Sequence, residues 1–182
     1  MNSRREYEIA FVGLKQGIHE FSFAIDDSFF EEFGAQDFKG CKAQVTLKLE
    51  KGSASFMILR FEVGGAADVS CDRCSNELSF QLFDEFVVTV KLVDEPELMN
   101  EQEEDPDVYY LSKGESHLDV KGWIFEFINL SIPMQKTCEY ENMDGPQCNP
   151  AARAILKNNQ AAEAVKENPI WKGLGKFKDL DN

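Results

Sequence analysis

Residues 42–63, KAQVTLKLEKGSASFMILRFEV, alternate apolar and polar side chains on both sides of a glycine-containing connection. Successive side chains of a strand point to opposite faces, so this two-residue period predicts two strands with one wet face each. Lys51-Gly52 supplies the turn between them, and the stretch therefore predicts an antiparallel hairpin. Its apolar face carries Ala43, Val45, Leu47, Leu49, Met57, Leu59, Phe61 and Val63.

Other periodic stretches on both sides of this hairpin predict an α+β protein. We expect a mainly antiparallel sheet of about six to eight strands with two or three packed helices. A barrel-like sheet is the alternative to an open one. Asp27 or Ser28 can cap the first helix and Gly34 can end it, whereas Gly64-Gly65 predicts a turn. The remaining elements are a hairpin within 6–25, a helix at 27–34, strands at 66–70, 78–93 and 109–111, and helices at 117–131 and 150–166.

The length of 182 residues fits one domain, which we place at residues 1–166. Residues 167–182 form a C-terminal tail that docks on the domain or on a partner. Within the domain, eight of the fourteen residues in 94–107 are acidic, which predicts a solvated loop. This loop is either a plain loop tip or an anionic arm that attracts a lysine-rich partner.

The net charge of −14 restricts the partners of the protein. Such a charge repels the phosphate backbone of nucleic acid, so it argues against DNA binding and favours a basic protein partner. The alternative is that the acidity only keeps the protein soluble. The sequence shows no secretory signal pattern and no apolar stretch long enough to span a membrane, so we expect a cytoplasmic protein without membrane contact.

Four of the five cysteines are candidate metal ligands. Cys71-Asp72-Arg73-Cys74 places two thiols at a tight turn, and Cys138 and Cys148 could complete a tetrahedral, structural zinc site. The nine residues between the second pair are more than the usual two to four. The alternatives are plain reduced thiols and a redox pair. Cys41 stands alone as a core or surface thiol.

The sequence offers little to support an active site. His19 and His117 have no nucleophile at a recognisable spacing, and no phosphate-binding glycine motif is present. We therefore expect a protein that is not an enzyme. The opposing hypothesis is a thiol-redox or metal-dependent enzyme that uses Cys71 and Cys74.

The tail interleaves aromatic and basic side chains. Trp171, Lys172, Lys176 and Phe177 are candidate partner-binding residues. Such a pattern can contact RNA by stacking and charge, can bind a protein as a short amphipathic segment, or can dock on the parent domain. Direct RNA binding stays open.

Several segments together resemble the YceD-type family of large ribosomal RNA subunit accumulation proteins. The resemblance rests on order: Val69-Ser70-Cys71-Asp72-Arg73-Cys74, a long strand, an acidic insertion and a helix precede the downstream motifs. Those motifs are Leu130-Ser131-Ile132-Pro133-Met134, Cys138, Cys148 and the closing Asn168-Pro169-Ile170-Trp171.

The resemblance implies a non-enzymatic role in ribosome assembly that supports accumulation of the large-subunit (23S) rRNA. In bacteria, genes of this family commonly neighbour the gene of a small, basic, zinc-ribbon ribosomal protein. The resemblance therefore also implies that the partner is a basic ribosomal protein or an assembly or processing factor.

Overall fold

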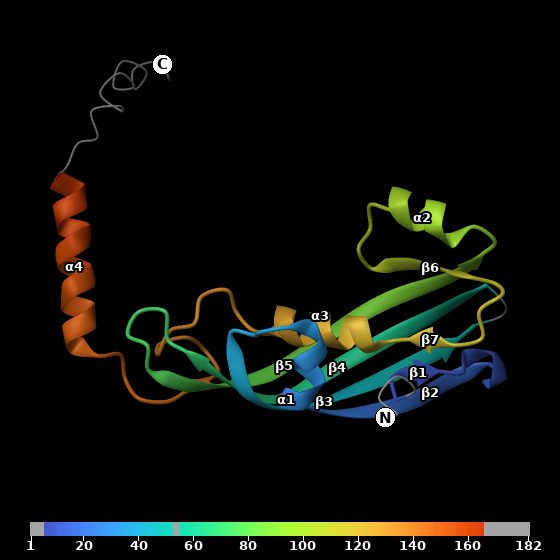
Figure 1. Cartoon of the computed structure of the whole chain (residues 1–182), viewed down its shortest axis with the longest axis horizontal. Helices are drawn as coiled ribbons and strands as arrows, with labels where there is room; N and C mark the ends of the chain where they lie inside the picture. The colour runs from blue at the N-terminus through green and yellow to red at the C-terminus, as the bar shows by residue number, and fades with distance from the viewer. Residues whose placement is uncertain (1–5, 53–54, 166–182) are drawn as a thin grey trace, which may run out of the picture.

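A computed structural model describes residues 6–52 and 55–165 of the chain (Figure 1). The fold is α+β, as the sequence predicts. The strands are β1 (Glu8–Ile9), β2 (Gly17–Asp26), β3 (Phe38–Lys51), β4 (Phe56–Ser70), β5 (Glu77–Val93), β6 (Val108–Ser112), β7 (Leu118–Asp119) and β8 (Met143–Asp144). The helices are α1 (Asp27–Phe30), α2 (Pro96–Gln102), α3 (Lys121–Ser131) and α4 (Pro150–Val165), with 3₁₀ turns η2 (Phe11–Gly13) and η3 (Glu31–Phe33).

The main sheet is open. Its strand order is β2-β3-β4-β5-β6, and β8 pairs with β5 beside this path, while β1 and β7 form a separate pair. All neighbours in the main sheet are antiparallel except β5 and β6. The order has two ends, so the barrel-like alternative is wrong, because β2 and β6 do not pair with each other.

The predicted central hairpin is confirmed as β3 and β4. Leu47 lies opposite Phe61 and Leu49 opposite Leu59, and all four side chains are fully buried. Helix α3 covers this face, where the Phe127 ring lies 5.0 Å from the Phe61 ring, centroid to centroid. Burial of these large side chains away from water is the main source of stability in such a layered core.

The predicted hairpin within residues 6–25 is wrong. Strand β1 pairs with β7, with Ile9 opposite Leu118, whereas β2 pairs along all ten residues with β3. The connection between β1 and β2 is bound to the end of β3, because the Lys51 ammonium donates to the carbonyls of Phe11 and Leu14 at 2.8 and 2.9 Å.

The first predicted helix is present but is capped one residue earlier than expected. Asp26 accepts a hydrogen bond from the Ser28 N–H at 2.9 Å, as an N-cap does. Asp27 instead accepts from the backbone N–H of Cys41 at 2.7 Å, which ties α1 to β3. The helix continues as η3 and ends at Gly34, whose φ is +90°.

The prediction of a turn at Gly64-Gly65 is wrong. Both glycines lie inside β4, which runs without interruption from Phe56 to Ser70. Gly65 has a φ of +138°, and a Cβ there would lie 2.2 Å from the carbonyl oxygen of Lys42. Gly65 pairs with Ala43, next to a bulge at which the register of β3 shifts between Lys39 and Lys42. The glycine therefore permits a close approach of the two strand backbones rather than a chain reversal.

The acidic segment 94–107 is not wholly a loop, because it contains α2. Two hydrogen bonds of 2.8 Å join the Asn100 side-chain amide to the backbone N–H and carbonyl of Tyr110 on β6. The Tyr110 hydroxyl also donates to Glu103 at 2.7 Å. These contacts between residues about ten apart, which composition does not reveal, fix α2 over β6.

The later elements follow the predictions closely. Helix α3 ends at Ser131 as expected, but it begins at Lys121 rather than 117, because Leu118–Asp119 form β7. Asn149 caps α4, and its side chain accepts from the Ala151 N–H at 2.9 Å. None of the helices described is long and apolar enough to cross a membrane. The predicted tail, 167–182, lies outside the described residues, and the 1–166 domain boundary stays a prediction.

The substitution Gly65→Ala should lower the free energy of unfolding by about 2 kcal/mol or more, because alanine disfavours this φ and its methyl group meets the Lys42 carbonyl. Urea denaturation followed by circular dichroism measures this change. The matched control is Gly64→Ala, whose methyl group would meet nothing within 4 Å. Equal stability of both variants would contradict a close approach of β3 and β4 that depends on Gly65.

Candidate functional site: a four-cysteine cluster

The turn between β4 and β5 presents the first pair of cysteines. The Ser75 N–H donates to the Cys71 carbonyl and the Cys71 N–H donates to the Asn76 carbonyl, both at 2.8 Å. Ser75 has a φ of +58°. The turn connects two strands and opens no helix, so it differs from the strand-to-helix setting typical of redox C-x-x-C pairs.

The segment after α3 returns to this turn and brings the second pair of cysteines with it. The Asp72 N–H donates to the Lys136 carbonyl at 2.7 Å, and the Lys136 N–H donates to the Asp72 carboxylate at 2.6 Å. Strand β8 then pairs with β5, with Met143 opposite Phe80. These hydrogen bonds and the pairing of β8 hold the segment against the sheet, beside the cysteine turn.

The four predicted cysteines meet. The sulfur atoms of Cys71, Cys74, Cys138 and Cys148 all lie within 4.8 Å of one another, and the sulfurs of Cys74 and Cys138 are 3.6 Å apart. Cys71 and Cys148 are buried, and the other two are half-buried. The wide spacing of the second pair is thus compatible with a compact cluster, because the intervening residues loop through β8.

The surroundings of the thiols lower the pKa of Cys74 and raise the pKa of Cys138 and Cys148. Backbone N–H groups of Asn149 and Asn76 donate to the Cys74 sulfur and lower its pKa to about 6. Burial, together with the neighbouring thiols of Cys71 and Cys74, raises the pKa of Cys138 to about 12. Burial also raises the pKa of Cys148. Four sulfurs this close disfavour simultaneous ionisation in the absence of a compensating positive charge.

The donor set fits a zinc ion. Zn²⁺ is held in structural sites by four sulfur or nitrogen atoms, with Zn–S distances near 2.3 Å, which places tetrahedral sulfurs about 3.8 Å apart. The observed limit of 4.8 Å is within about 1 Å of that spacing. Cysteine thiolates are also the soft ligands that zinc and iron–sulfur centres prefer. Cys41 lies outside the cluster, and burial raises its pKa to about 11.

Charged side chains surround the cluster at the surface. Glu139 accepts from Arg73 at 3.1 Å and from Arg153 of α4 at 3.0 Å. The Lys136 ammonium pairs with Asp37. The ion pairs with Glu139 are exposed and contribute little energy, but they link the cysteine turn, the returning segment and the start of α4.

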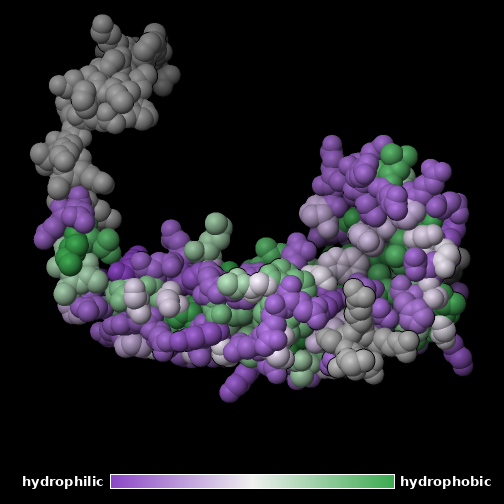
Figure 2. Space-filling model, viewed as in Figure 1, coloured by the Kyte–Doolittle hydropathy of each residue, from purple (hydrophilic) through white to green (hydrophobic). Residues whose placement is uncertain are grey.

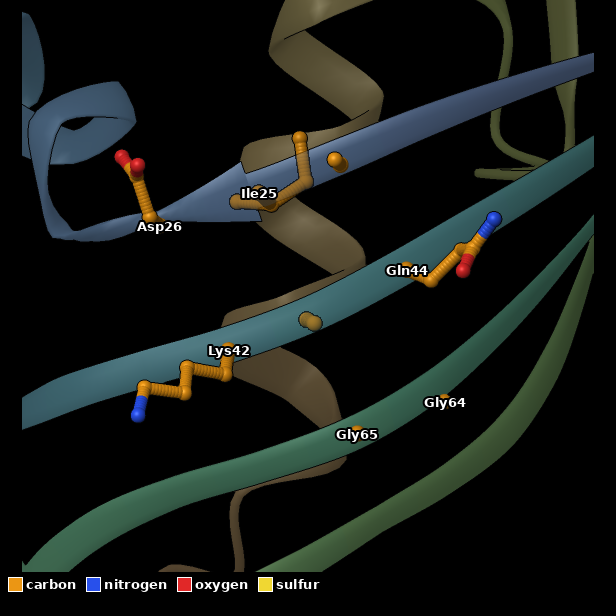
Figure 3. A pocket seen from close by; sticks show the side chains of 8 residues that line it. Ile25, Asp26, Lys42, Gln44, Gly64 and Gly65 are labelled. Atoms are coloured by element: carbon orange, nitrogen blue, oxygen red, sulfur yellow. The ribbon is translucent and has the colours of Figure 1, made fainter.

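A shallow depression of about 580 Å³ lies on the outward face of the sheet (Figure 3). Gly64 and Gly65 provide a strip without side chains, beside Lys42, Gln44 and Asp26. The Asp26 carboxylate already caps α1, and its hydrogen bonds with Ser28 lower its pKa. The depression is open and presents no arrangement typical of a catalytic site.

Some predicted site residues lie outside the described part of the chain, and some residues that position the site were not predicted. The tail residues Trp171, Lys172, Lys176 and Phe177 lie outside the described residues. Sequence reasoning missed Asp72 and Lys136, whose paired hydrogen bonds position the returning segment. No sequence signal joins two polar residues this far apart, although an Asp inside a C-x-x-C turn is a natural acceptor for backbone N–H groups.

Fold and cluster together define a small α+β protein in which two cysteines of the β4–β5 turn lie beside two cysteines of the C-terminal third of the chain. The family described as large ribosomal RNA subunit accumulation protein YceD matches residues 59–178, which is well over half of the chain. The protein therefore belongs to the YceD family, and the resemblance noted in the sequence is confirmed. In the same comparisons, no curated protein and no solved structure matches the chain significantly.

The substitution Asp72→Ala should speed tryptic cleavage after Lys136 by about fivefold, because it removes the acceptor that holds the Lys136 N–H. Time courses read by mass spectrometry measure the rate. Asp84→Ala, an exposed carboxylate on β5, is the matched control. Unchanged cleavage in Asp72→Ala would show that this contact does not position the segment.

Proposed function

We propose that the protein is a non-enzymatic ribosome-assembly factor. It supports accumulation of large-subunit rRNA by binding a basic ribosomal protein or another assembly factor. The observation that carries the proposal is the match to the YceD family, whose description names large-subunit rRNA accumulation. The net charge of −14 supports a basic protein as partner.

In the same proposal, Cys71, Cys74, Cys138 and Cys148 hold one structural zinc ion. Zinc would supply the positive charge that four neighbouring thiolates require. Because all four positions are taken by protein ligands, such a site has no open coordination position for substrate, which is typical of structural rather than catalytic zinc. The ion would join the turn after β4 to the segment that follows α3.

Protein purified after expression with added zinc should contain about one equivalent of the metal. The variant Cys148→Ser should lose most of it, because a hydroxyl is a poor replacement for a thiolate ligand. Elemental analysis by mass spectrometry measures the ratio. Cys41→Ala is the control, since Cys41 lies outside the cluster and should leave zinc content unchanged. A wild-type protein with under about 0.2 equivalents would exclude the zinc site.

Affinity capture from a lysate tests the proposed role. The immobilised protein should retain a basic ribosomal protein or a large-subunit assembly factor, and the retention should survive nuclease treatment and weaken with added salt. An unrelated protein of similar size and negative charge is the control for non-specific attraction. Retention of the same proteins by this control, or their loss after nuclease treatment, would count against a direct protein partner.

A further inference from the structure

A groove with aromatic walls lies between β6 and α3. Its volume is about 480 Å³, and its lining includes Tyr109 of β6, Trp123 of α3, and Leu118 and Asp119 of β7. The two rings meet edge to face with centroids 5.3 Å apart. Tyr109 is exposed and Trp123 half-buried. Figure 1 shows β6 and α2 rising beside α3 and β7.

The carboxylates that line this groove give it negative charge. Asp119 and Glu126 line it, and both are exposed. Neither makes an ion pair with any side chain that the structure describes. The acidic segment 94–107 follows β5 and leads into β6 on the same side, where Figure 2 shows a hydrophilic surface over α2.

Lys121, next to Gly122 in the chain, and Lys113, which follows β6, are engaged with other groups. Lys121 pairs with Glu32 and lies over the rings of Tyr7, Phe29 and Phe33 at 5.6 to 5.7 Å. Lys113 pairs with Asp94 at 2.8 Å. The residues that line the groove include neither lysine nor arginine, and the ring of its one histidine, His117, shares a hydrogen bond of 2.8 Å with the Ser116 hydroxyl. A cation from another molecule would therefore meet aromatic faces and two carboxylates that pair with no lysine or arginine of the described chain.

We propose that this groove binds a lysine or arginine side chain from a basic segment of a partner protein. Aromatic faces attract such cations, and the carboxylates of Asp119 and Glu126 add charge complementarity. The aliphatic part of a long basic side chain also suits the apolar contribution of Leu118 and Leu111. This inference rests on the proposed function and names the surface that the basic partner would use.

Gly122 allows the groove to be blocked without disturbing the core. It lies in the first turn of α3 and lines the groove, and a Cβ added there would meet nothing within 4 Å. The variant Gly122→Lys places a cation of the protein's own where the ligand cation is expected. Gly122→Ala leaves the groove open and serves as the matched control.

A fluorescein-labelled hexalysine peptide is the probe, at about 100 mM salt to limit long-range attraction. Fluorescence anisotropy should show about tenfold weaker binding to Gly122→Lys than to wild type or Gly122→Ala. The double variant Asp119→Asn/Glu126→Gln should bind at least about threefold more weakly. Its matched control is Glu20→Gln/Glu50→Gln, which removes two exposed carboxylates from the sheet face turned away from α3 and should change binding less than about twofold.

A second, local readout comes from tryptophan fluorescence. In Trp171→Phe protein only Trp123 remains, so unlabelled hexalysine should change its emission. Absence of peptide binding to wild type, equal weakening in the two double variants, full binding by Gly122→Lys, or no response of Trp123 would each overturn the groove proposal.

The affinity capture described above separates the two proposals. If wild type and Gly122→Lys retain the same ribosomal protein equally, the assembly role stands and the groove proposal is wrong. If wild type retains none, the proposed function fails whatever the peptide does. A groove that selects an rRNA fragment over hexalysine in competition would also overturn the inference in favour of RNA.

Discussion

The antiparallel pairing of β4 with β5 is the constraint on which the rest of the structure depends. It runs through fifteen residue pairs without a register shift, from Phe56 opposite Lys91 to Ser70 opposite Glu77. One end of this ladder is the cysteine turn, and the other end receives β6 and α2 (Figure 1). A long ladder of this kind fixes the spacing of everything attached to it.

The two ends of the ladder have different chemistry. At the cysteine end, backbone hydrogen bonds of Asp72 with Lys136 and the pairing of β8 bring distant thiols together. At the other end, β6 and α3 form an aromatic groove bordered by carboxylates. The proposed metal would stabilise the junction at the cysteine end, whereas the proposed partner surface lies at the other end of the ladder.

The glycines and acidic residues show why local sequence misleads at particular places. Gly64-Gly65 has the composition of a turn, yet β4 continues through it. Position 65 needs a residue without Cβ because the β3 backbone at Lys42 lies so close to it. The acidic segment has the composition of a loop, yet α2 forms in it, because the Asn100 side-chain amide satisfies both the backbone N–H and the carbonyl of Tyr110. In both cases the deciding contact is made with another strand.

The sequence by itself determined the α+β class, the β3–β4 hairpin, the end of α3, the cap of α4 and the four cysteines of the cluster. These features follow from side-chain period and local hydrogen bonding, which depend on near neighbours in the chain. Only the tertiary structure decided that β1 pairs with β7, that the sheet stays open, that the cysteines meet within 4.8 Å and that β6 and α3 enclose a groove. Those features depend on contacts between residues far apart in the chain. Bringing such residues together costs conformational entropy, which the burial of the packed core offsets.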